Sequence, residues 1–168
     1  MKHKVQKPRI TVLGVGNILY SDEGIGVRVI EYLRENFQFP DNVDVVDGGV
    51  LGMNLMGIIT ATDHLIIVDA VQNRNEPGTL YRMADEQIPR RILAKNSLHQ
   101  VDMVEVLTLC RMVDKEPTVV VVGVEPADIR TLGIELTPVV HSRKKDLAGM
   151  VLDELKRLGI DCPGKQVV

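Results

Sequence analysis

The sequence predicts one α/β domain of three layers, a mostly parallel twisted sheet with helices on both faces. Short apolar runs rich in β-branched residues alternate along the chain with stretches of helical period. These runs are apolar at consecutive positions, which is typical of strands buried on both faces of a parallel sheet. The length of 168 residues is that of a single domain, 1–168, and residues 1–8 and 160–168 are expected to be flexible tails.

The first half of the chain contains three candidate strands, and two of them are followed by candidate helices. The helices are predicted where apolar residues recur every three or four positions opposite charged ones. The strands are predicted where β-branched residues lie together between Gly, Asn, Asp and Pro. In order, these elements are a strand at Ile10–Val15, a helix from Ile25, a strand at Val43–Val46, a helix over about Leu51–Ile59 and a strand at Leu65–Val68.

The second half adds a peripheral strand at Thr79–Met83 and the most continuous β-branched run of the chain, Thr118–Val124. Ser97–Gln100 fits a capping box, with Ser at the cap and Gln three residues later, so a helix is expected to follow. The last helix is predicted to begin at Thr137-Pro138, a cap followed by a first-turn proline, and to stop at Gly159.

Composition argues against several classes of partner. The net charge is -3 with Lys and Arg scattered among Asp and Glu, so no basic face is available for nucleic acid. Aromatic residues are only 3%, which removes the stacking platforms of a single-strand binder. No signal peptide or membrane-length apolar run is found, and Cys110 and Cys162 match no metal or redox spacing. The chain is therefore expected to be cytoplasmic, without membrane insertion.

Four residues that are able to do chemistry are expected at one edge of the sheet. Glu23 follows the first strand, Asp47 closes the second, Asp69 closes the third, and His99 falls in the first turn of its helix. The carboxyl ends of parallel strands, and the helices that begin there, meet at one edge of an open sheet. The predicted fold alone thus gathers three carboxylates and an imidazole.

Each of these residues has a structural interpretation when it is taken alone. An acid at a strand end is often a helix cap, and a single histidine is usually structural or exposed. Taken together, close carboxylates repel one another, and a cation would reverse that repulsion. Two oxygen ligands and one nitrogen suit nickel, zinc or another divalent transition ion and leave a coordination position open. His3, His64 and His141 are weaker candidates, interpreted as structural or exposed.

The glycines after the first strand favour a second interpretation, a nucleotide-dependent oxidoreductase. Gly14-Val15-Gly16 follows a strand, as in a dinucleotide-binding fingerprint, but the third glycine would fall at Leu19. Asp22 and Glu23 would also repel a pyrophosphate at the start of the helix. The oxidoreductase is therefore the less favoured alternative.

Several short motifs, in order, resemble those of the nickel-iron hydrogenase maturation endopeptidases. They cover about residues 10 to 140, and their recurrence together is specific. The motifs are Leu13-Gly14-Val15-Gly16-Asn17-Ile18-Leu19, Asp22-Glu23-Gly24-Ile25-Gly26, Asp47-Gly48-Gly49, Asp69-Ala70, Ser97-Leu98-His99-Gln100, Gly123-Val124-Glu125-Pro126, Gly133 and Leu136-Thr137-Pro138.

The resemblance implies an enzyme that removes the C-terminal extension of the nickel-loaded hydrogenase large-subunit precursor. It implies that Glu23, Asp69 and His99 bind the metal and that Asp47 positions substrate or takes part in proteolysis. Nickel would arrive with the substrate, zinc or a similar ion could substitute for it, and the protease would act as a monomer. The ligands would equally serve a nickel-sensing checkpoint or chaperone that cuts nothing, which stays as the first alternative.

Overall fold

A five-stranded sheet forms the centre of the computed structural model, which describes residues 7–49, 55–89 and 103–166. Its strands are β1 (Ile10–Val15), β2 (Val43–Gly49), β3 (His64–Ala70), β4 (Leu80–Ala84) and β5 (Thr118–Val124). They lie in the order β2-β1-β3-β5-β4, and only the edge strand β4 is antiparallel to its neighbour. The predicted fold class is confirmed, and the strand expected to be peripheral lies at the edge.

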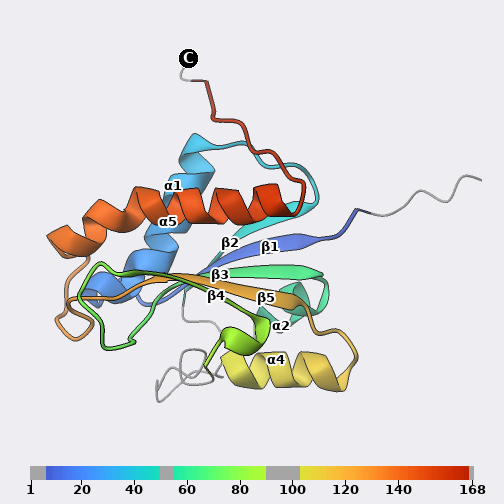
Figure 1. Cartoon of the computed structure of the whole chain (residues 1–168), viewed down its shortest axis with the longest axis horizontal. Helices are drawn as coiled ribbons and strands as arrows, with labels where there is room; N and C mark the ends of the chain where they lie inside the picture. The colour runs from blue at the N-terminus through green and yellow to red at the C-terminus, as the bar shows by residue number, and fades with distance from the viewer. Residues whose placement is uncertain (1–6, 50–54, 90–102, 167–168) are drawn as a thin grey trace, which may run out of the picture.

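Helices cover both faces of this sheet (Figure 1). One face packs against α1 (Ile25–Asn36) and α5 (Pro138–Arg157), and the other against α2 (Met56–Thr60) and α4 (Met103–Met112). Two short 3-10 helices, η1 (Ser21–Gly24) and η3 (Asp85–Gln87), complete the described elements. Two apolar cores result, one on each side of the sheet, as expected for strands that are apolar at consecutive positions.

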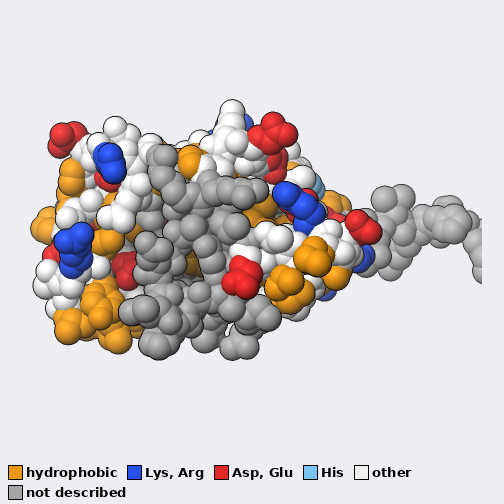
Figure 2. Space-filling view, turned by 90° about the horizontal axis from the view of Figure 1, so that it is seen from below, with side chains coloured by type: hydrophobic (Ala, Val, Ile, Leu, Met, Phe, Trp, Pro, Cys, Tyr) orange, Lys and Arg blue, Asp and Glu red, His pale blue; other side chains and the backbone are white. Residues whose placement is uncertain are grey.

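The face that carries α2 and α4 has mixed charges. Figure 2 shows its described Lys and Arg side chains scattered among Asp, Glu and apolar groups. No basic patch forms there among the described residues. None of the described helices combines the length and apolar character that a bilayer crossing requires.

The predicted start of the last helix is correct, but the expected side-chain cap is not made. Thr137 is the N-cap residue of α5 and Pro138 lies in its first turn, yet no side-chain cap hydrogen bond forms. The Thr137 hydroxyl donates instead to the carboxylate of Asp22. The capping box predicted at Ser97–Gln100 lies outside the described residues.

Glycines let α1 approach the sheet very closely. A β-carbon on Gly26 would lie less than 3.0 Å from the carbonyl oxygens of Val15 and Val68, and one on Gly14 would meet the Gly26 carbonyl equally closely. Gly16 has a φ of +132°, a conformation that other residues rarely adopt. The first turn of α1 therefore rests directly on the backbone at the ends of β1 and β3.

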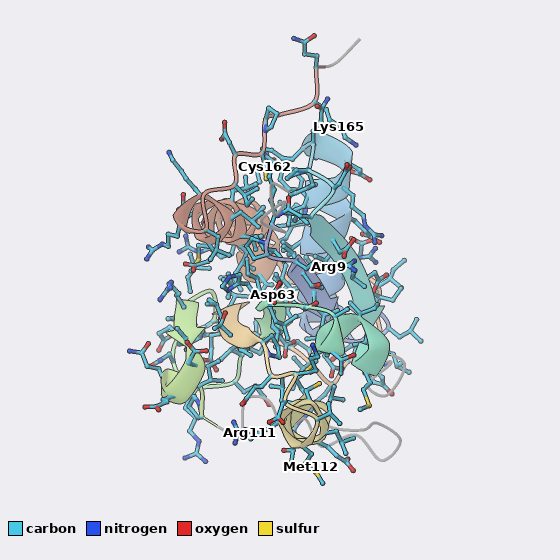
Figure 3. All side chains as sticks on the ribbon, turned by 90° about the vertical axis from the view of Figure 1, so that its right-hand side faces the viewer. Arg9, Asp63, Arg111, Met112, Cys162 and Lys165 are labelled. Atoms are coloured by element: carbon cyan, nitrogen blue, oxygen red, sulfur yellow. The ribbon has the colours of Figure 1, made fainter. Side chains whose placement is uncertain are left out.

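Backbone hydrogen bonds join the end of the described chain to the last residue of α1 and the segment that follows it. Gln38 N donates to Pro163 O at 2.9 Å, and Lys165 N donates to Asn36 O at 2.7 Å. Cys162 packs against the core between α1 and α5. Figure 3 shows Cys162 and Lys165 on the irregular segment that passes beside the end of α1. The flexibility expected of residues 1–8 and 160–168 stays a prediction.

Candidate active site

Asp47 and Asp69 lie at the carboxyl edge of the sheet on the two strands that flank β1. Gly14 of β1 pairs with Asp47 on one side and with Val68 on the other, and Asp69 pairs with Gly123. Because Asp47 and Asp69 are two strand spacings apart, their backbones are separated by about 10 Å. This is the edge at which the sequence places them.

Strand alternation brings the two aspartates to this edge from opposite faces of the sheet. Asp69 is on the same face of β3 as Leu65 and Ile67, because alternate residues of a strand point to the same side. Leu65 and Ile67 belong to the core under α2 and α4. Asp69 is buried, with 4% of its surface exposed. Asp47 is on the same face of β2 as Val45, which packs on the α1 side. The Asp47 side chain is exposed, and its Oδ1 accepts a hydrogen bond from Gly49 N at 2.9 Å.

Glu23 lies in η1, the turn of 3-10 helix that leads from β1 into α1. Helix η1 lies against the end of β3, the strand that carries Asp69. The Glu23 side chain is half-buried, and within the described chain its carboxylate makes no hydrogen bond or ion pair. An acid that caps a helix would accept a backbone N–H, so the capping interpretation does not fit Glu23.

His99 lies outside the described residues, so its predicted position beside Glu23 and Asp69 stays a prediction. Among residues 7–49, 55–89 and 103–166, no three His, Cys, Asp or Glu side chains gather in a way that could hold a metal. A third ligand for Glu23 and Asp69 would therefore have to come from outside that part of the chain. The weaker candidates are elsewhere: His64 pairs with Thr118 at the opposite edge, and His141 is exposed on α5.

The glycines that suggested a nucleotide have a packing role. A β-carbon on Gly16 would overlap the Glu23 carbonyl oxygen, and Gly14 and Gly26 give the close helix-to-strand contact. The turn between β1 and α1 is thus filled by η1. This packing explains the glycine spacing without a bound pyrophosphate.

Sequence reasoning missed Asp22, whose carboxylate is completely buried with 0% of its surface exposed. Its Oδ2 accepts from the backbone N–H groups of Ala127 and Asp128, both at 2.9 Å. Its Oδ1 accepts from Thr137 N at 2.8 Å, and the Thr137 hydroxyl contacts both oxygens. The only signal in the sequence is its position beside Glu23.

Glu125 is a second buried carboxylate that sequence reasoning did not assign. It follows β5, is 6% exposed, and accepts from the backbone N–H groups of Asn73 and Arg74, in the loop after Asp69. It also accepts a hydrogen bond from the Tyr81 hydroxyl. Burial, and then this bond to Glu125, raise the pKa of Tyr81 above its ordinary value.

Comparison with known proteins points to one family. The model of the HycI family, described as hydrogenase maturation protease, matches residues 27–154, which contain Asp47, Asp69 and His99 but not Glu23. The chain is 40% identical over 162 residues to the hydrogenase 2 maturation protease of Escherichia coli, covering 95% of this chain and 98% of that protein. It is also 40% identical over 154 residues to the hydrogenase expression/formation protein HupD of Bradyrhizobium diazoefficiens, covering 89% and 80%.

A solved structure agrees with these sequence matches. The hydrogenase maturating endopeptidase HybD from Escherichia coli superposes with a TM-score of 0.87 at 40% identity, over 94% of this chain and 98% of that one. Fold and sequence are thus similar over nearly the whole length of both chains.

Proposed function

This chain belongs to the hydrogenase maturation protease family, and from that premise we propose that it removes the C-terminal extension of a nickel-loaded nickel-iron hydrogenase large-subunit precursor. The observation that supports the proposal most directly is the Glu23 carboxylate. It is half-buried at the carboxyl edge, it lies against the end of β3, and it makes no hydrogen bond or ion pair within the described chain. A carboxylate kept in that condition is ready to accept an electropositive group.

In this proposal Glu23, Asp69 and His99 hold the nickel that the precursor brings, and zinc or a similar ion could substitute. The donor set suits such an ion, since it combines carboxylate oxygens with an imidazole nitrogen. When bound, a divalent ion polarises a carbonyl and lowers the pKa of a water ligand. Asp69 presents its carboxylate from a buried strand end, so it contributes an oxygen with little freedom to move.

Asp47 has a different role in the proposal. It is exposed, and one of its oxygens accepts a hydrogen bond from Gly49 N. This bond fixes the orientation of the carboxylate at the end of β2. The other oxygen is able to accept an N–H of the substrate chain or a proton from water. Asp47 therefore orients the extended substrate or assists proteolysis rather than binding the ion.

The proposal extends to the setting in which the protein works. In this proposal the protease meets its precursor in the cytoplasm and acts as a monomer. Size-exclusion chromatography with light scattering should give the mass of one chain, 18.6 kDa.

Incubation of the purified protein with nickel-loaded precursor, followed by intact-mass spectrometry, tests the proposal. We expect loss of one C-terminal peptide from nickel-loaded precursor and none from nickel-free precursor. Precursor that binds but is never shortened would support the non-proteolytic checkpoint instead. A heat signal on titration with NAD or NADP would favour the oxidoreductase.

A further inference from the structure

Asp22 is a buried anion whose partners are all neutral. Its four donors are the backbone N–H groups of Ala127, Asp128 and Thr137 and the Thr137 hydroxyl, at 2.8 to 3.0 Å. Within the described part of the chain, no Lys, Arg or His contacts this carboxylate, and it makes no other hydrogen bond or ion pair. Burying a charge of this kind is unfavourable unless the charge is completely hydrogen-bonded. These four donors therefore offset the cost of removing the Asp22 carboxylate from water.

The bonds of Asp22 join two parts of the edge that are far apart in sequence. Helix η1 is tied to the segment after β5 through Asp22, through Ser21 N to Gly133 O at 2.7 Å, and through Ser21 Oγ to Glu135 O at 2.9 Å. Asp22 N also donates to Asp128 O at 3.0 Å. The residue before Glu23 is thus fixed on several sides while the Glu23 carboxylate makes no hydrogen bond or ion pair within the described chain.

We propose that Asp22 is a positioning residue for Glu23, which rests on the function proposed above. It fixes the backbone of η1, so that the Glu23 carboxylate is presented at the edge before the ion arrives. Its buried negative charge, which no cationic side chain of the described residues offsets, also makes the neighbouring position favourable for a cation. The two adjacent acids therefore have different roles: Asp22 is hydrogen-bonded to the protein, and Glu23 is presented to the ion.

Asp22→Asn tests this division because the amide is similar in size but cannot satisfy the same donors. One oxygen of Asp22 faces the N–H groups of Ala127 and Asp128, and the other faces Thr137 N. In either orientation the amide NH₂ meets a backbone N–H, so one loop must move. We expect binding of Zn²⁺ alone, followed by titration calorimetry, to weaken about 10- to 100-fold. Cleavage of nickel-loaded precursor should slow by a similar factor.

Binding of the precursor separates positioning from a general structural role. Wild-type protein should prefer nickel-loaded over nickel-free precursor, and Asp22→Asn should lose that preference while its affinity for the nickel-free form stays unchanged. Loss of stability alone would lower both affinities together. If Asp22→Asn does not fold, Thr137→Val removes one donor and keeps the carboxylate, and it should weaken Zn²⁺ binding several-fold.

Glu154→Gln is the matched control, because Glu154 is a buried carboxylate, 6% exposed, that pairs with Arg82 away from this edge. It should lower the melting temperature yet leave Zn²⁺ binding and cleavage unchanged. Wild-type Zn²⁺ affinity and loaded-precursor preference in Asp22→Asn, or equal losses in Glu154→Gln, would overturn the positioning role. Failure of the wild-type protein itself to cleave nickel-loaded precursor would instead count against the proposed function.

Discussion

The two edges of the sheet use their acidic residues differently. At the amino edge, Asp44 pairs with Arg9, Asp63 accepts from Arg9 N, and Asp85 accepts from Val119 N. Figure 3 looks onto this edge, where Arg9 and Asp63 lie side by side. At the carboxyl edge, the Asp22 carboxylate is fully bonded by the protein, while the carboxylate of its neighbour Glu23 makes no hydrogen bond or ion pair within the described chain.

This difference shows which acids hold the fold together and which are kept for a ligand. A carboxylate that accepts N–H groups or pairs with a cation is accounted for by the protein itself. Glu23 lacks such partners at a place where the backbone is tightly fixed. Acidic residues at the amino edge should therefore be replaceable without loss of activity, and Glu23 should not.

Of the substitutions considered at the two edges, Glu23→Gln should have the largest effect on the cleavage rate. We expect cleavage of nickel-loaded precursor to fall by about 1,000-fold, since a neutral amide is a poor ligand and charge stabilisation is lost. The melting temperature should stay close to wild type, because the carboxylate makes no hydrogen bond or ion pair within the described chain. Mass spectrometry and a thermal melt measure the two quantities.

Asp44→Asn at the amino edge is the control for this change. It should leave the cleavage rate as it is in the wild-type protein. Equal losses of activity at the two edges would remove the distinction between them.

Gly26→Ala should show how firmly the carboxyl edge is built. The added methyl group would lie less than 3.0 Å from the Val15 and Val68 carbonyl oxygens, so α1 must shift away from the sheet. We expect a loss of about 3 kcal/mol in the free energy of unfolding, measured by urea denaturation. Gly149→Ala in α5 is the matched control, because nothing lies within 4 Å of its added carbon. It should stabilise the helix by about 0.5 to 1 kcal/mol, and an equal loss there would contradict the packing argument.

Tyr81 offers a smaller effect with a clear pH dependence. Its pKa is raised, first by burial and then by the hydrogen bond to Glu125, so its phenol should ionise above the ordinary range of a tyrosine. The stability that it contributes is complete below pH about 10 and is lost as the pH rises through the folded-state pKa. Absorbance of the phenolate band should show one late titration, which Tyr81→Phe should remove. A late titration that survives in Tyr81→Phe would assign it to another tyrosine.

Arg9→Ala at the amino edge should have the smallest effect. The side chains of Arg9 and Asp44 are 52% and 41% exposed, so their ion pair is screened by water and salt. We expect the free energy of unfolding to change by less than about 1 kcal/mol and the cleavage rate to stay constant. A loss of several-fold in cleavage would show that the amino edge contributes to activity.

The strands were predictable because burial on both faces leaves an unmistakable apolar run. The bounds expected for Ile10–Val15 and Thr118–Val124 are those of β1 and β5. The edge that collects Asp47 and Asp69 was predictable for the same reason, since strand direction determines where strand ends meet.

The roles of two adjacent acids could not be predicted. Asp22 and Glu23 have the same chemistry, and they differ because backbone N–H groups of Ala127, Asp128 and Thr137 converge on the first and not on the second. These donors lie more than 100 positions away in sequence. The hydroxyl of Thr137, expected to cap its own helix, is diverted to Asp22 for the same reason.

The packing of α5 against α1 has a consequence for synthesis of the chain on the ribosome. Leu147, Val151 and Leu155 of α5 complete the core that contains Ile30 and Leu33 of α1. Helix α1 is made early, and the part of its apolar side that packs against α5 stays uncovered until α5 has been synthesised. Nascent chains stalled before residue 138 should consequently expose this surface to chaperones, and release of the finished polypeptide should hide it.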